Sequence, residues 1–235
     1  MQKSLSRLIL AIALAILWDQ AAHATVIQTP AGLNPGDQFQ IIFVTTGTRD
    51  GTSTVIGDYD AFVNADAGSV TYNGLPVTFR AIGSTETVHA KDHIGQFSIL
   101  VYLNDGISKV TNHTTAGMTG GIWSKDFVDT VHLLHSINQA LDGTPRNTTV
   151  WSGTHEFGLA SAHPLGTSTP SRGFTIQDGG GWITYITKPS STLESMYGIS
   201  PVLTVPVPEP GSVILLGLGA VSLFAVARRR RQQTY

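Results

Sequence analysis

Two histidines and an aspartate lie close together in the segment His89-Ala-Lys-Asp-His93. In a helix, the four-residue spacing of His89 and His93 would place both imidazoles on one face, where Asp92 could complete a site for a divalent metal. The neighbouring stretches STETV and HIG are more typical of a loop. We therefore expect a solvated loop here and predict no metal site.

Two pairs of acidic residues offer oxygen ligands to a hard cation. The first pair is Asp58 with Asp60, and the second is Asp126 with Asp129. Neither pair belongs to a loop with the alternating oxygen ligands of an EF-hand. No cofactor is predicted, and calcium is kept as an alternative.

Motifs of the common enzyme classes do not occur in the sequence. It contains no GxSxG elbow, HExxH, Walker A or GxGxxG pattern, and it has no cysteine. Thiol catalysis, disulfide bonds and the common structural zinc sites are thereby excluded. We expect a protein that is not an enzyme. The alternative is a secreted hydrolase, which would need two convergent carboxylates or a nucleophile supported by histidine.

Trp151 lies in VWSGTHEFG, next to a stretch rich in glycine and polar residues. In such a place the indole ring could stack on the face of a sugar. A tryptophan buried for structural reasons is the alternative, and it is the commoner fate of this residue type. Trp151 is therefore a candidate for ligand stacking. Whether it binds a ligand or belongs to the core depends on the exposure of its ring.

The elements that must position these residues are short. Only 13% of the 235 residues are charged and 25 are glycine, which favours a turn-rich extracytoplasmic protein. Apolar spacing behind Thr54 predicts a helix at 56–67, whereas 127–141 fits neither helix nor strand cleanly. Strands are predicted at 38–45, 77–83, 98–103, 149–152, 182–187 and 202–205. The fold class is thus α+β, a single compact domain at 25–205 made of short strands with one or two helices.

The first 24 residues have the pattern of a secretory signal peptide. Lys3 and Arg7 precede an uncharged apolar run at 8–18, and Ala22 and Ala24 occupy the A-x-A cleavage positions. An uncleaved anchor is the alternative, but 11 apolar residues are too few to cross a hydrocarbon core of about 30 Å. Signal peptidase is expected to cut after Ala24.

Residues 206–235 form a second targeting segment. A proline-rich stretch leads into an uncharged run at 212–227, which in a helix would span about 24 Å and predicts a short transmembrane helix. Because arginines stay on the cytoplasmic side, the rest of the chain would lie outside. The residues of this pattern are Pro208, Glu209 and Pro210, followed by the cluster Arg228, Arg229, Arg230 and Arg231.

This order of motif, span and arginine cluster resembles the PEP-CTERM sorting signal of Gram-negative bacteria. The resemblance implies an exosortase, a membrane protease or transpeptidase that would cut near Pro208-Glu209-Pro210. It also implies a protein that is exported through the inner membrane, transiently anchored by its C-terminal helix, and then secreted or kept at the cell surface. Proteins sorted in this way are commonly associated with exopolysaccharide and the extracellular matrix.

Removing both targeting segments makes the remaining chain acidic. Residues 25–207 contain eight basic and 14 acidic residues, a net charge of −6. Such a domain is repelled by anionic polymers unless a cation bridges them. A nucleic acid is therefore excluded as a partner, and a neutral glycan or a calcium-bridged acidic one is favoured.

The central part also resembles the endostatin-like branch of the C-type lectin-like fold. The matching segments are 79–81, 99–105, Trp123 and 150–154, in that order. The disulfides usual in such domains are absent, and so are the Glu-Pro-Asn and Trp-Asn-Asp triplets of calcium-dependent lectins. The resemblance thus implies a fold and not that mode of sugar binding. Overall we expect a non-catalytic binding or structural module of the extracellular polymer layer, with a secreted hydrolase of surface polymers as the alternative.

Overall fold

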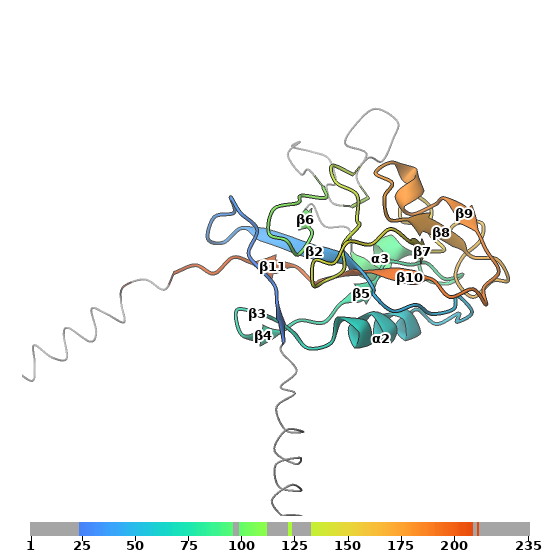
Figure 1. Cartoon of the computed structure of the whole chain (residues 1–235), viewed down its shortest axis with the longest axis horizontal. Coiled ribbons are helices and arrows are strands. Elements are labelled where there is room, and N and C mark those ends of the chain that lie inside the picture. The colour runs from blue at the N-terminus through green and yellow to red at the C-terminus, as the bar shows by residue number, and fades with distance from the viewer. Residues whose placement is uncertain (1–23, 96–98, 112–121, 124–132, 209–210, 212–235) are drawn as a thin grey trace, which may run out of the picture.

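The computed structural model describes residues 24–95, 99–111, 122–123, 133–208 and 211 (Figure 1). Its helical segments are α2 (Ile56–Ala67), α3 (Ala90–Ile94) and the 3-10 turn η1 (Gly180–Trp182). Its strands are β1 (Thr25–Val26), β2 (Gln38–Val44), β3 (Val70–Tyr72), β4 (Leu75–Pro76), β5 (Arg80–Ala81), β6 (Leu100–Tyr102), β7 (Thr149–Trp151), β8 (Ser171–Phe174), β9 (Ile186–Thr187), β10 (Ser195–Ile199) and β11 (Leu203–Thr204).

The strands form two sheets. The larger has the order β11-β2-β10-β7-β8-β9, with β5 paired to β10 and β6 paired to β2, and the smaller has the order β1-β3-β4. Pairing is mixed, because β2 runs antiparallel to β10 and β11 but parallel to β6. The described residues are thus mostly sheet with few helices. The C-type lectin-like resemblance stays a prediction.

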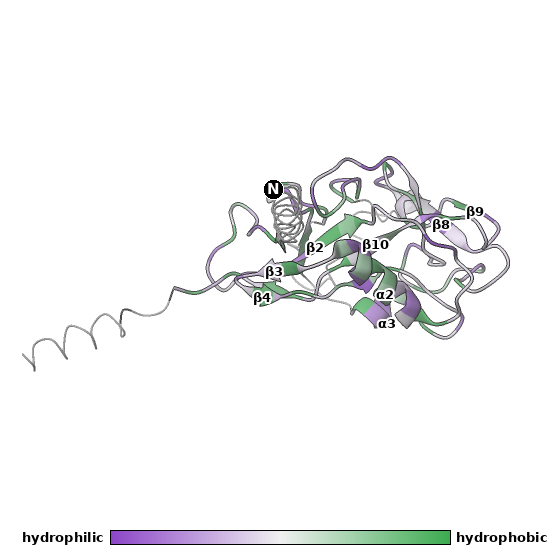
Figure 2. Ribbon diagram, turned by 60° about the horizontal axis from the view of Figure 1, so that its bottom comes forward, coloured by the Kyte–Doolittle hydropathy of each residue, from purple (hydrophilic) through white to green (hydrophobic). Residues whose placement is uncertain are grey.

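Strands β2 and β10 lie in the middle of the larger sheet and are covered on both faces. All five residues of β10 are buried, as are six of the seven residues of β2. Side chains of β2 alternate between two apolar clusters, with Phe43 on one side and Ile42 on the other. The hydropathy colouring shows the same apolar centre (Figure 2). The cluster around Phe43 includes residues of both sheets, as expected for a single domain.

Helix α2 packs on the Phe43 side of the sheet. It has the predicted bounds, and Tyr59 and Val63, four residues apart, are its buried residues. The expected cap at Thr54 is wrong, because Val55 is the N-cap residue and its side chain accepts no hydrogen bond. Ser53 instead provides the polar contacts at the start of the helix. Its hydroxyl accepts a hydrogen bond from the Val55 N–H and donates one to the Asp58 carboxylate.

Five predicted strands exist, most of them shorter than expected. The strand at 77–83 is reduced to β5, and the others correspond to β2, β6, β7 and β11. The prediction of a strand at 182–187 is wrong for its first residues, because Trp182 ends the turn η1. Only its last two residues, β9, pair in the sheet. Of the ambiguous segment 127–141, residues 127–132 lie outside the described residues, and the remainder contains neither helix nor strand.

Among the described glycines, Gly173 in β8 leaves the least room for a side chain. A Cβ atom at this position would lie 1.8 Å from the carbonyl oxygen of Trp182. We predict that Gly173→Ala lowers the free energy of unfolding by about 2 kcal/mol or more, because backbone must move to admit the methyl group. Urea unfolding of the two proteins measures the difference.

Gly57→Ala is the matched control. Gly57 is exposed in α2, and the nearest atom to its added Cβ is 4.0 Å away. This substitution should leave the free energy of unfolding unchanged or raise it by up to about 1 kcal/mol. Equal destabilisation by both substitutions would contradict the close approach at Gly173.

Two buried tyrosines should make the fold sensitive to alkaline pH. Burial raises the pKa of Tyr59 to about 12 and also raises that of Tyr197. Because the folded values exceed the unfolded value of about 10, the stabilisation is complete below about pH 10 and is lost as the pH rises toward 12. Urea unfolding at increasing pH, with phenolate absorbance, measures this loss. Tyr59→Phe should reduce it, whereas Phe at the exposed Tyr185 should not.

Candidate functional site

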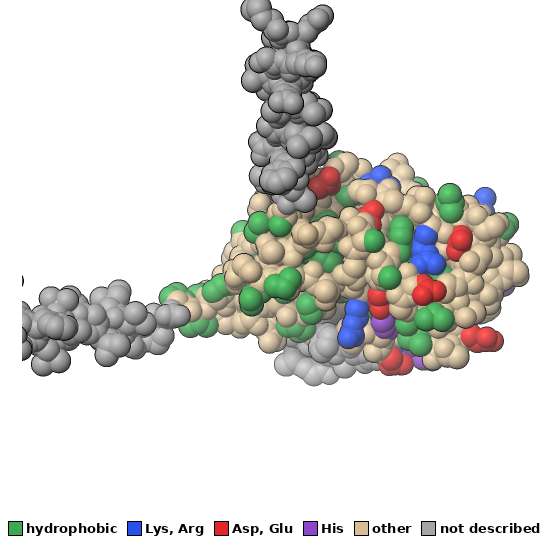
Figure 3. Space-filling view, turned by 90° about the horizontal axis from the view of Figure 1, so that it is seen from below, with side chains coloured by type: hydrophobic (Ala, Val, Ile, Leu, Met, Phe, Trp, Pro, Cys, Tyr) green, Lys and Arg blue, Asp and Glu red, His purple; other side chains and the backbone are tan. Residues whose placement is uncertain are grey.

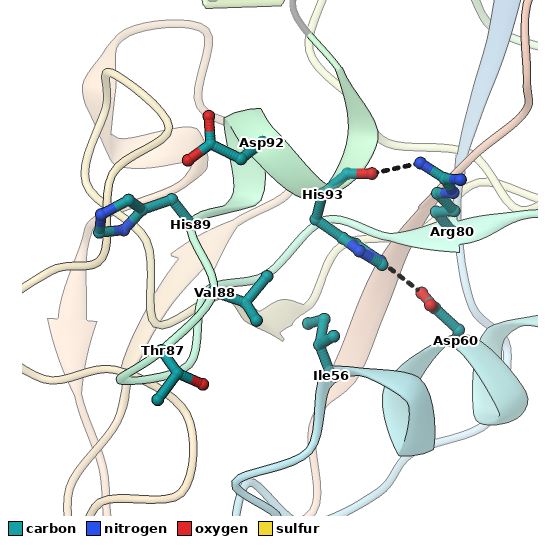
Figure 4. Close-up of a pocket in the computed structure, with 8 residues that line it drawn as sticks. All are labelled: Ile56, Asp60, Arg80, Thr87, Val88, His89, Asp92 and His93. Atoms are coloured by element: carbon teal, nitrogen blue, oxygen red, sulfur yellow. Dashed lines mark hydrogen bonds and ion pairs between the residues drawn. The ribbon is translucent and has the colours of Figure 1, made fainter.

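A surface pocket of about 550 Å³ lies where α2, α3 and β5 meet (Figure 4). It contains most of the titratable residues that the sequence brings to attention. Its lining residues are Ile56, Asp60, Arg80, Thr87, Val88, His89, Asp92 and His93. The contacts and orientations of these side chains therefore show whether they form a metal or catalytic site.

Asp60 and His93 form a hydrogen-bonded contact that ties α2 to α3. The Asp60 Oδ1 atom is 2.9 Å from His93 Nε2, and the same oxygen accepts a hydrogen bond of 2.7 Å from the Ala81 N–H of β5. On the other side, the Arg80 guanidinium donates to the His93 carbonyl (Figure 4). The carboxylate of Asp60 is thus engaged in holding three elements together.

The cation site considered for the acidic pairs finds no support in the described residues. The Asp58 carboxylate accepts a 2.6 Å hydrogen bond from the Ser53 hydroxyl, whereas that of Asp60 contacts His93 and the Ala81 N–H. Asp126 and Asp129 lie outside the described residues. Within the described part of the chain, no group of three or more histidine or acidic residues is arranged to hold a metal ion.

His89 and His93 do not face each other, although the segment is helical where a loop was expected. His89 is the N-cap residue of α3 and has extended backbone angles, φ −85° and ψ 139°. The four-residue spacing therefore does not align the two imidazoles, which extend in opposite directions (Figure 4). His89 Nδ1 instead accepts a hydrogen bond of 2.9 Å from the Ala160 N–H.

Some lining residues of the pocket are open to solvent, and others are engaged within the fold. Arg80 and Asp92 are exposed and can meet a polar ligand. The Thr87 hydroxyl lies on the side of the pocket away from His93, whose Nε2 is turned to Asp60 (Figure 4). Among these residues, none forms a nucleophile supported by histidine.

Trp151 is buried, which corrects its assignment as a stacking residue. Its side chain has 0% exposure, and its indole N–H donates a hydrogen bond of 3.0 Å to the Arg49 carbonyl. An added Cβ at Gly51 would lie 3.1 Å from the ring, so the chain packs directly on the indole. A sugar cannot reach this ring in the folded protein.

An aromatic pair in which one ring is exposed lies instead on β8 and beside β9, and Phe174 is its half-buried member. The ring centroids of Phe174 and Tyr185 are 5.8 Å apart at an angle of 33°, and Tyr185 is 57% exposed. Sequence reasoning placed Tyr185 in a strand without deciding which way its ring points. The β-branched residues around it, in WITYIT, carry no alternation that would have shown the exposed side.

The pair of Asp60 and His93 yields a prediction about stability. Asp60→Ala removes the acceptor of the Ala81 N–H and the partner of His93, so it should lower the free energy of unfolding by about 1–3 kcal/mol. The control is Asp92→Ala, which changes an exposed carboxylate of the same pocket and should alter the value by less than about 0.5 kcal/mol. Equal effects in urea unfolding would show that the Asp60 contacts do not support the fold.

The targeting segments lie at the edges of the described residues. Ala24 is exposed immediately before β1, and Pro208 is exposed four residues after β11. Within the described part, no helix has the length and apolar character needed to cross a membrane. Several residues of the predicted signals lie outside this part: Ala22, Glu209, Pro210, Arg228, Arg229, Arg230 and Arg231, with the predicted helix at 212–227.

Comparison with known families identifies the C-terminal segment. The model of the PEP-CTERM protein-sorting motif matches residues 206–231. The chain matches none of the curated proteins with which it was compared. The match confirms the sorting signal predicted from the Pro-Glu-Pro motif and the segment behind it. The chain therefore carries a PEP-CTERM protein-sorting motif, which points to an exosortase-sorted protein that is secreted or held at the cell surface.

Proposed function

We propose that this chain is a non-catalytic module that binds exopolysaccharide at the cell surface or in the extracellular matrix. The observation that carries the proposal is the sorting motif at 206–231, which begins two residues after the last strand of the folded domain. Signal peptidase would remove residues 1–24, and exosortase would act near Pro208. Both steps deliver the domain to the compartment where extracellular polymers are found.

The surface of the domain supports a neutral glycan as the ligand. Its net charge of −6 between residues 25 and 207 opposes an anionic polymer unless a cation such as calcium bridges the two. The exposed ring of Tyr185, backed by Phe174, offers an apolar face with a hydroxyl at its edge. Such a ring can cover the C–H face of a sugar while its hydroxyl forms a hydrogen bond.

A secreted hydrolase remains the alternative because the pocket holds two carboxylates. Asp60 and Asp92 both line it, and a pair of carboxylates is the usual equipment for cleaving a glycosidic bond. Asp60, however, is engaged by His93 and by the Ala81 N–H. Hydrolysis would therefore require the carboxylate to leave contacts that hold α2 in place, which favours binding.

The test is a pull-down of the mature protein with polysaccharide from the bacterium that makes it, in calcium and in chelator. We expect saturable binding, and Tyr185→Ala should weaken it about tenfold, the effect of losing about 1.4 kcal/mol of ring contact. Tyr185→Phe keeps the ring and removes only the hydroxyl, so as the comparison variant it should weaken binding less than Tyr185→Ala. Loss of binding in chelator would place a bridging cation at the contact.

The same samples distinguish the alternative. Gel filtration of the polysaccharide after incubation should show no shortening. Shortening that Asp92→Asn abolishes, with the free energy of unfolding unchanged, would establish a hydrolase and refute the binding module. Absence of both binding and shortening would refute the polysaccharide as the partner.

A further inference from the structure

An apolar groove lies beside β11, at the end of the domain from which the sorting tail leaves. Its volume is about 320 Å³, and it is formed by the β3–β4 hairpin and the segment 201–204. None of its lining residues is charged. Leu75, at the hairpin, is 70% exposed, which is unusual for a large aliphatic side chain next to other apolar residues.

The apolar character extends around this end of the molecule. Val207, which follows β11, is 65% exposed, and Val26 of β1 is 61% exposed. In the space-filling view, the surface next to the C-terminal tail shows hydrophobic and uncharged side chains, whereas the charged side chains gather farther from it (Figure 3). Because its surface is apolar and uncharged, this end of the domain is suited to contact with an apolar partner.

The first and last strands of the domain both lie near the β3–β4 hairpin that forms one wall of the groove. Strand β1, which follows the predicted signal peptide, pairs with β3, and β3 pairs with β4. Strands β3, β4 and β11 supply lining residues of the groove. The strand that follows the predicted signal peptide thus belongs to the same small sheet as the hairpin that lines the groove, and the strand that precedes the sorting motif lines the groove itself.

The tether between the domain and the membrane is short. The Val205 N–H donates a hydrogen bond of 2.9 Å to the Asp37 carbonyl, so the chain is fixed to the domain up to this residue. The uncharged run begins at Ser212, seven residues later. At about 3.3 Å per residue, this spacer reaches about 23 Å when it is extended. The groove is thus held close to the lipid headgroups whenever the tail is in the bilayer.

We propose that the groove docks on the lipid surface while the tail anchors the chain, with Leu75 and Pro76 entering the interfacial region. The proposal rests on the sorting motif and its anchoring role, and it does not depend on exopolysaccharide binding. A lipid surface is the occupant that the short tether brings to the groove. The tether also makes a weak contact sufficient, because it converts docking into an intramolecular event at high effective concentration.

The experiment uses the absence of native cysteine. Leu75→Cys carries a nitrobenzoxadiazole label, and the full chain is reconstituted through its tail into phosphatidylcholine vesicles. The matched control is a label at Leu193→Cys, a leucine that is 63% exposed in the segment between β9 and β10. Emission from the label at position 75 should be roughly twofold or more above its value in water and should shift to shorter wavelength, because the probe enters the lipid interface. Emission from the control label should not change.

Two outcomes would overturn the proposal. Equal emission at the two positions would show that the groove stays in water. A rise at position 75 that occurs only when exosortase is added would assign the groove to a protein partner.

Because the groove is uncharged, the expected rise should also persist at about 1 M salt, where the Debye length is about 3 Å. Urea unfolding of each labelled variant verifies that the domain is folded.

Discussion

The pairing of β2 with β10 is the interaction on which the rest of the fold depends. Strands β5, β6, β7 and β11 all pair with one of these two strands, and both core clusters include their side chains. Without disulfides, close packing must hold this centre together. Gly198 makes that packing feasible, because an added Cβ would lie 2.5 Å from the Phe43 ring and 2.6 Å from Val63 of α2. A glycine in the middle of a strand thus lets the helix settle on the sheet.

Polar side chains around this centre serve mainly to connect its layers. Asn64 of α2 forms two hydrogen bonds with the backbone of Phe79, and Asp60 accepts from Ala81. At the far side of the sheet, Arg172 of β8 pairs with Glu194, which is 6% exposed. Breaking such a pair would leave a buried charge without a partner. In the pocket at α2, Asp60 likewise connects separate elements, since it contacts both His93 of α3 and the Ala81 N–H of β5.

The sequence predicted those elements whose pattern is local. The bounds of α2 follow from the spacing of Tyr59 and Val63, and β2 follows from a long apolar run. Strand β10, with the sequence SMYGI, was missed because serine and glycine are poor strand formers, and its burial comes from neighbours distant in the chain. Helix α3 has five residues, too few for a periodic pattern. The burial of Trp151 was likewise undecidable, because Gly51 and the Arg49 carbonyl, which surround it, lie about 100 residues away.

The sorting motif could be identified from sequence because its recognition depends on order along the chain and not on folding. What the structure adds is the place where the segment before the motif leaves the domain, directly after β11. The aromatic pair Phe174–Tyr185 belongs to the β8–β9 end, which lies opposite the end where β11 continues into the tail (Figure 1). With the groove docked on the bilayer as proposed, the exposed Tyr185 ring would face away from the lipid. The two proposed contacts, with lipid before processing and with a glycan, use opposite ends and would not compete.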